Sequence, residues 1–185
     1  MGKTTIAKEI ATYQYPVWNS DKVVHLLYKK GNLGYKKIKT IVPEATVGNS
    51  VNREVLSKTV VENPFLLKKI EKLIHPLLEY DRLKFIEKYK TKQLIVFDIP
   101  LLFETNCERW LDTVIVATAP FFIQKKRVLA RKSMTESKFK YILSQQYSNE
   151  QKIKKADIVL NTNVSKSKLS LRIQEIIQKV LENHV

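Results

Sequence analysis

The sequence lacks the features that mark a secreted or membrane-bound protein. Its 185 residues contain a single cysteine, Cys107, which excludes an internal disulfide and suits a reducing compartment. No apolar run approaches the ~20 residues that cross a bilayer, and no basic segment followed by an apolar core indicates export. We therefore expect a cytoplasmic protein that does not bind membranes.

Acidic residues are scarce as well. Asp and Glu number 18 against 33 Lys and Arg, which gives a formal net charge of +15. Such an excess invites a nucleic-acid partner, yet the lysines are spread over the whole chain and outnumber the arginines 27 to 6. A basic protein that handles polyanionic small molecules such as nucleotides would have the same composition. We expect small-molecule ligands and no nucleic acid, with a non-catalytic basic nucleic-acid-binding module as the alternative.

No internal repeat, low-complexity segment or long linker divides the chain, so we expect one domain over residues 1–185. Apolar runs typical of strands buried on both faces of a parallel sheet alternate with amphipathic segments. The expected strands are 16–21, 93–98, 113–118 and 156–161. The expected helices are 4–13, a short segment after 22, 52–60, 64–74, 77–89, 121–132, 135–146 and 169–181. The glycines and proline between 31 and 48 predict a loop-rich region, and His75-Pro76 predicts a helix end. The pattern predicts an α/β fold with a parallel sheet, flanking helices and a helical insertion over 22–92.

Near its start the chain has Gly2-Lys3-Thr4-Thr5 ahead of an amphipathic helix, which is the second half of a phosphate-binding P-loop. Gly2 lets the backbone approach a phosphate, Lys3 reaches the β- and γ-phosphates, and the Thr4 hydroxyl can hold Mg²⁺. We therefore expect a nucleotide site with Mg²⁺ that involves Thr5 as well. The alternative is a chance occurrence of a common tripeptide at a helix start.

The front half of this motif, and the strand that usually precedes it, would lie ahead of Met1. We therefore expect the first central strand of the sheet to be missing from this chain. The chain starting at Met1 is accordingly expected to have weak ATP affinity or low solubility, because buried backbone groups of the neighbouring strands would lack partners.

Two further features fit phosphate chemistry. Asp98 ends an expected strand, in the position of the carboxylate that holds Mg²⁺ in P-loop enzymes; the alternative is an acid satisfied by a nearby backbone N–H. Arg127 and Arg131 are four residues apart and are expected on one helix face. In a chain with six arginines this spacing favours planar recognition of phosphate, although a solvated basic face is the usual outcome.

Several motifs, in order along the chain, resemble those of the dephospho-CoA kinase family, whose fold is that of P-loop kinases. The matching segments are Gly2-Lys3-Thr4-Thr5, Ser20-Asp21 in place of Asp-Ala-Asp, Asn52-Arg53 with Leu56, Ile74-His75-Pro76-Leu77, Asp98-Ile99-Pro100-Leu101-Leu102-Phe103-Glu104, Arg127, Arg131, Gln146 and Ala156-Asp157. The segment from Asp98 to Glu104 is the most specific match. Together they cover essentially the whole chain.

The resemblance implies a kinase that transfers the γ-phosphoryl of ATP to the ribose 3′-hydroxyl of dephospho-CoA, the last step of coenzyme A synthesis. By matching position, Lys3 and Thr4 would serve the triphosphate and Mg²⁺, and Asp21 would contact or deprotonate the acceptor hydroxyl. The acceptor site would be lined by Arg53, His75, Pro100, Leu101 and Glu104. Arg127 and Arg131 would close over the phosphates as part of a lid at about 121–150.

Some alternatives stay open. Asn19 replaces the first acid of Asp-Ala-Asp, so any role of that acid is absent here. Asp21 is also a candidate N-cap for a helix starting at Lys22, and His75 is also explained as a polar residue before a proline. Another P-loop kinase acting on a nucleoside or nucleotide is the nearest rival function. We expect a monomer or a weak oligomer.

Overall fold

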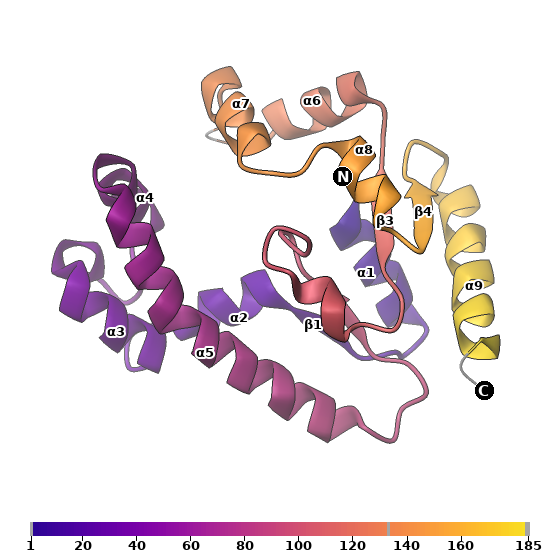
Figure 1. Cartoon of the computed structure of the whole chain (residues 1–185), viewed down its shortest axis with the longest axis horizontal. Helices are drawn as coiled ribbons and strands as arrows, with labels where there is room; N and C mark the ends of the chain where they lie inside the picture. Colours follow the sequence, from indigo (N-terminus) through magenta and orange to yellow (C-terminus); the bar gives the residue numbers. More distant parts are fainter. Residues whose placement is uncertain (1, 133, 184–185) are drawn as a thin grey trace. The chain divides into compact units, whose positions relative to one another are not determined.

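The computed structural model describes residues 2–132 and 134–183 (Figure 1). Met1, on which the question of the chain's start depends, lies outside the described residues. The chain divides into two compact units. The terminal unit consists of Met1–Val17 and Pro100–Val185, and the central unit consists of Trp18–Ile99. Within the described ranges, no helix combines the length and the apolar character needed to cross a bilayer.

The terminal unit is built on a pair of parallel strands. Its elements are α1 (Lys3–Thr12), the 3₁₀ helix η2 (Cys107–Trp110), β3 (Ile115–Thr118), α6 (Phe121–Leu129), α7 (Glu136–Ser144), α8 (Asn149–Lys154), β4 (Ile158–Asn161) and α9 (Lys166–Glu182). Ile115 lies opposite Ile158 and Thr118 opposite Asn161. The chain crosses from β3 to β4 through α6, α7 and α8 (Figure 1), because parallel strands need a long connection.

The first and last helices of this unit pack against each other. Ile6 and Ile10 of α1 and Ile173 of α9 are buried in the contact. At its edge the Ser170 hydroxyl donates to the Glu9 carboxylate at 2.5 Å. Burial of this amphipathic stripe explains why α9 forms where the 3.6-residue period of its apolar residues predicts it.

The central unit is mostly helical. Its elements are β1 (Val17–Asn19), α2 (Ser20–Leu27), α3 (Leu33–Ile41), the 3₁₀ helix η1 (Pro43–Thr46), α4 (Arg53–Glu62), α5 (Pro64–Tyr89) and β2 (Val96–Asp98). One apolar cluster holds the helices together, formed by Tyr28, Tyr35, Ile38, Val42, Ala45, Val51, Leu56, Ile70 and Ile74. β1 pairs with β2, and Trp18 lies against Phe97 with its indole N–H donating to Asp81 at 2.8 Å.

The predicted helix end at His75-Pro76 is wrong, because α5 continues through Pro76. A proline lacks the N–H that would bond the carbonyl four residues earlier, here that of Lys72. Lys72 and Pro76 are both exposed, so water can replace the lost hydrogen bond. Ile74 and Leu78, on either side of the proline, pack on the apolar cluster. This burial outweighs one missing hydrogen bond and keeps the helix continuous.

The loop-rich region predicted between 31 and 48 contains α3. Gly34 is part of this helix and approaches α2 closely: an added Cβ would lie 2.7 Å from the carbonyl oxygen of Leu27. Glycine at this position therefore permits helix packing instead of marking a loop, a use that local sequence cannot distinguish.

Two helices of the crossover also differ from prediction. α6 ends at Leu129, short of the predicted 132. α8, which was not predicted, is six residues long and starts with a capping box in which Ser148 and Gln151 bond each other's backbone N–H groups. So short a helix carries too few apolar positions to show a period.

The strands are shorter than the predicted runs, and they form two two-stranded sheets. β4 is not buried on both faces as predicted: Val159 is 45% exposed, whereas Leu160 is 2% exposed. The strand therefore has one face toward the core and one toward solvent. The α/β architecture with flanking helices is confirmed. The missing first strand concerns a position ahead of Met1 and stays a prediction.

Candidate functional site

Gly2 in the terminal unit has a backbone that favours glycine. Its φ is 100°, in the left-handed region, and it is the residue that precedes α1. Its carbonyl accepts hydrogen bonds from the N–H groups of Thr5 at 2.9 Å and Ile6 at 3.0 Å, which closes the first turn. An added Cβ would lie 2.7 Å from Cγ2 of Thr162. Both the dihedral angle and the close approach therefore require glycine.

Thr162 joins three parts of this site. Its hydroxyl donates to the Thr118 carbonyl at 2.9 Å, and Thr118 ends β3. Arg127 of α6 donates through both terminal nitrogens, to the Thr162 hydroxyl at 3.2 Å and to its carbonyl at 3.2 Å. The meeting point follows the C-terminal ends of two parallel strands, the edge at which α/β proteins bind ligands. Sequence reasoning missed Thr162; its signal was a polar residue directly after a strand.

The P-loop residues and Arg127 thus lie in one unit, at one edge of the β3–β4 pair. Lys3 is the first residue of α1 and half-buried, while Thr4 and Thr5 are exposed in the same turn. The helix N-terminus there carries backbone N–H groups that favour an anion. The arrangement can receive phosphate.

The prediction that Arg131 shares a helix face with Arg127 is wrong, because α6 ends before Arg131. Its backbone N–H instead bonds the Val128 carbonyl at 3.0 Å, in the turn that ends the helix. The side chain is exposed, and among residues 2–132 and 134–183 it has no hydrogen bond or ion pair. Its guanidinium is available to a ligand.

Asp98 ends β2 in the central unit and is buried. Its Oδ2 accepts a hydrogen bond from the Asn19 side-chain amide at 2.7 Å, and its carbonyl accepts one from the Ser20 hydroxyl at 3.4 Å. The carboxylate is therefore held by a side chain from the neighbouring strand. Asn19, the last residue of β1, and Ser20, the first residue of α2, are the two partners.

Asn19 uses both ends of its amide. While its nitrogen donates to Asp98, its Oδ1 accepts from the Lys22 N–H at 2.8 Å, which makes Asn19 the N-cap of α2. The suggested capping role of Asp21 is therefore wrong. An aspartate at position 19 could cap the helix equally well, but it would set a second carboxylate against Asp98. The amide at position 19 therefore supplies Asp98 with a donor that an ionised aspartate would lack.

The prediction that Asp21 ends a strand is wrong. Asp21 lies exposed in the first turn of α2. Arg53 begins α4, and its guanidinium carbon lies 5.8 Å from the centre of the Tyr28 ring. Burial raises the pKa of Tyr28, and the charge of Arg53 partly offsets this. Because Tyr28 follows the last residue of α2, Asp21 and Tyr28 are about 10 Å apart along the helix axis, at ~1.5 Å per residue. His75 is exposed in the middle of α5.

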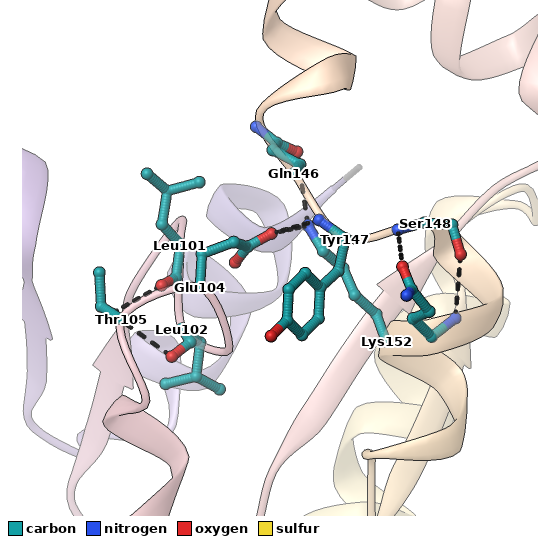
Figure 2. A network of polar contacts seen from close by, with 9 residues as sticks. Leu101, Leu102, Glu104, Thr105, Gln146, Tyr147, Ser148 and Lys152 are labelled. Atoms are coloured by element: carbon teal, nitrogen blue, oxygen red, sulfur yellow. Dashed lines mark hydrogen bonds and ion pairs between the residues drawn. The ribbon is translucent and has the colours of Figure 1, made fainter.

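The loop that contains Pro100, Leu101 and Glu104 belongs to the terminal unit. Figure 2 shows that the Glu104 carboxylate points away from the loop toward Tyr147, whose N–H donates to Oε1 at 2.9 Å. The Lys152 ammonium lies 3.0 Å from the same oxygen. Burial opposes the charge on Glu104, but the bonds from Lys152 and Tyr147 outweigh it and hold the pKa of Glu104 below its ordinary value. Sequence reasoning found Glu104 and missed Lys152.

Comparison with known proteins identifies the family. A family model described as dephospho-CoA kinase matches residues 1–168. The dephospho-CoA kinase of Ruegeria pomeroyi is 36% identical over 185 residues, which cover 100% of this chain and 93% of that protein. The dephospho-CoA kinase of Brucella melitensis is 40% identical over 179 residues, 96% of this chain and 88% of that protein.

Two solved structures share the fold. The crystal structure of TT1252 from Thermus thermophilus superposes with a TM-score of 0.81 at 27% identity, covering 97% of this chain and 92% of the other. Dephospho-CoA kinase from Campylobacter jejuni gives a TM-score of 0.70 at 23% identity, covering 100% and 94%. The matches span nearly the full length of the chain and of its relatives. The chain belongs to the dephospho-CoA kinase family.

Proposed function

We propose that this chain transfers the γ-phosphoryl group of ATP to the ribose 3′-hydroxyl of dephospho-CoA, the last step of coenzyme A synthesis. The observation that carries the proposal is the meeting of Gly2, Arg127 and Thr162 at the C-terminal edge of β3 and β4. That arrangement suits a triphosphate, and family membership supports the identity of the acceptor. We propose that the protein acts in the cytoplasm as a monomer or weak oligomer.

The phosphates are assigned to the terminal unit. The N-terminus of α1, with Gly2, Lys3, Thr4 and Thr5, would cradle the β- and γ-phosphates. Arg127 already presents both terminal nitrogens to two oxygens of Thr162, and the same planar fork suits two phosphate oxygens. Arg131 would add a second guanidinium from the turn after α6. Charge that develops in the transition state is stabilised by such fixed donors.

Thr4 and Asp98 are the residues assigned to Mg²⁺. Magnesium takes one or two protein oxygens together with phosphate oxygens and waters, so each of these residues offers a donor of the right kind. Asp98 is buried and its Oδ2 is fixed by Asn19, which fits a carboxylate that must keep one orientation. A magnesium ion held there would neutralise part of the phosphate charge.

Asp21 is assigned to the acceptor hydroxyl. As the 3′-hydroxyl attacks the γ-phosphorus, its proton passes to the Asp21 carboxylate, a new oxygen–phosphorus bond forms, and the bond to the β–γ bridging oxygen breaks to release ADP. The exposed position of Asp21 in the first turn of α2 leaves its carboxylate accessible. Arg53, His75, Pro100 and Leu101 would line the acceptor site, and Glu104, whose carboxylate bonds Tyr147 and Lys152, would hold the loop that carries Pro100 and Leu101.

The proposal is tested by incubating the purified chain with Mg²⁺, one acceptor at a time and ATP raised to saturation, because weak ATP affinity is expected, and by measuring ADP and the phosphorylated product. Dephospho-CoA should be phosphorylated at its 3′-hydroxyl, whereas adenosine, AMP and other nucleosides should not. Preferential phosphorylation of a nucleoside or nucleotide would replace dephospho-CoA by the rival acceptor class. Omission of Mg²⁺ in a parallel reaction should stop turnover with the true acceptor.

A further inference from the structure

Two ion pairs fasten the segment after Pro100 to α8. Glu104 pairs with Lys152 at 3.0 Å, and Glu108 pairs with Lys155 at 3.2 Å. Glu104 lies in the loop before η2 and Glu108 within η2, whereas Lys152 lies in α8 and Lys155 directly follows it. The two contacts therefore act side by side between the same two segments.

The Glu104–Lys152 pair is shielded from water. The side chains of Lys152 and Glu104 are 17% and 12% exposed, whereas those of the surface pair Lys90 and Glu87 are 62% and 71% exposed. Removing one member of a shielded pair leaves the other charge without compensation, whereas exposed pairs contribute little. A substitution at Glu104 or Lys152 is therefore expected to move the segments that the pair joins.

One of these segments is the end of the predicted lid. Residues 145–148 join α7 to α8, and we call them the lid root. The Tyr147 N–H in this root donates to Glu104, and the Gln146 side-chain oxygen accepts from Lys152 at 3.4 Å (Figure 2). α6 and α7, which precede the root, contain Arg127 and lead to and from Arg131. Glu104 thus holds the point from which these helices extend.

The second oxygen of Glu104 argues against a purely stabilising role. Oε2 is buried and, within the described chain, has no hydrogen-bond partner. A buried carboxylate oxygen without a partner lowers stability. The orientation of the side chain is therefore set by Oε1, the atom that meets both the lid root and Lys152.

We propose that Glu104 and Lys152 are positioning residues that fix the lid root on the Pro100–Glu104 loop. In the proposed function this loop lines the acceptor site, and α6 carries Arg127, which is assigned to the phosphates. The anchor therefore fixes the position of the acceptor loop relative to the phosphate-binding helix. The inference rests on the proposed function for its kinetic consequence, but the anchoring itself is a property of the terminal unit. Neither residue needs to touch a reacting atom.

Three variants and a matched control test this. Glu104→Gln keeps the shape and can still accept from Tyr147, but it loses the charge. Lys152→Met keeps an apolar stem without the ammonium, and Lys152→Arg restores a charge. Glu87→Gln removes the exposed pair of the central unit and serves as the control. For each variant we would measure kcat, both KM values, the thermal midpoint and hydrogen exchange of residues 136–147.

We expect kcat to fall about tenfold in Glu104→Gln and in Lys152→Met, within the roughly 2- to 30-fold range of coupling effects transmitted by residues that do not touch a ligand. The double variant should be no slower than either single one, because both changes remove one contact. Exchange over 136–147 should rise in both, Lys152→Arg should recover most of the rate, and Glu87→Gln should match the wild type.

A lower thermal midpoint with unchanged kcat and unchanged exchange over 136–147 would overturn the proposal, because the pair would then be merely structural. Additive losses in the double variant would overturn it as well, since Glu104 would then act on the substrate independently of Lys152. If the wild type does not phosphorylate dephospho-CoA, the proposed function fails, and exchange over 136–147 alone decides whether the anchor exists.

Discussion

The two units hold their candidate residues in different ways. In the terminal unit, Arg127 and Glu104 are fixed by at least two polar contacts each, to Thr162 and to Tyr147 and Lys152. In the central unit, buried Asp98 is likewise held by Asn19, but Asp21 and His75 are exposed on helices held by an apolar cluster. Arg127 is assigned to the phosphates, which are the same in every ATP molecule, so its donors can be held rigidly. Exposed residues on packed helices suit an acceptor that must enter and leave.

The largest expected effects come from substituting one candidate residue in the central unit and one in the terminal unit. Asp21→Asn should lower kcat about 10²- to 10⁴-fold, the usual contribution of a general base, with an unchanged thermal midpoint because the side chain is exposed. Lys3→Ala should lower the rate through loss of phosphate stabilisation. Steady-state kinetics with dephospho-CoA would measure both, and Lys22→Gln in the same turn as Asp21 is the control. Near-normal turnover in Asp21→Asn would remove that residue from the mechanism.

Gly2→Ala tests the rigidity of the phosphate side. The added Cβ meets Thr162 at 2.7 Å, and a non-glycine residue at φ 100° is strained by ~1–3 kcal/mol. We expect ATP affinity to fall about 10- to 100-fold. Gly31→Ala is a matched control, because Gly31 has φ 93° and nothing within 4 Å. It should cost stability without changing ATP binding measured by calorimetry; equal effects of the two on ATP binding would contradict the contact argument.

Asn19→Asp sharpens the account of the central unit. Replacing the donor by a carboxylate beside buried Asp98 should lower the free energy of unfolding by about 1–3 kcal/mol near neutral pH. Acid should reduce this loss, because protonating one carboxyl restores a donor between the two. Asn52→Asp, at the N-cap of α4, should be neutral since Asp and Asn cap equally well. Chemical denaturation at several pH values would measure the free energy of unfolding. A loss of stability that is as large in acid as at neutral pH would contradict this account.

The smallest effect concerns the pH dependence of Glu104. Its pKa is lowered on folding from an ordinary value of 4.5, so its charge stabilises the native state above that value. The contribution is lost as pH falls from about 4.5 through the lowered pKa. The thermal midpoints of wild type and Glu104→Gln should therefore differ at neutral pH and converge in this acidic range. A difference that does not shrink as the pH falls below 4.5 and through the acidic range would show that the charge contributes nothing.

Local signals in the sequence predicted much of this structure. Asn52 was expected to cap α4, and its side chain accepts from the N–H groups of Glu54 and Val55. Such a cap needs no information beyond the neighbouring residues. The period of α9 and the motif from Asp98 to Glu104 were equally readable, the first because one face is buried and the second because it resembles a family.

Contacts between distant residues could not be predicted in this way. Asn19 and Asp98 are 79 residues apart, and Arg127 and Thr162 are 35 apart. Each bond depends on the pairing of strands that bring the partners together. The continuity of α5 through Pro76 likewise depends on burial against other helices, which overrides the local preference. The placement of the candidate residues, more than their identity, is what the structure adds.

The shortness of α8 has a consequence for how the chain folds. A six-residue helix is far below the ~12–15 residues at which isolated helices become marginally stable. Its capping box and its lysine contacts must therefore supply what length does not. Because the bond from Tyr147 to Glu104 closes a separation of 43 residues, this helix is expected to form late, after the two segments have met. Weakening the contact should accordingly speed unfolding and leave the folding rate nearly unchanged.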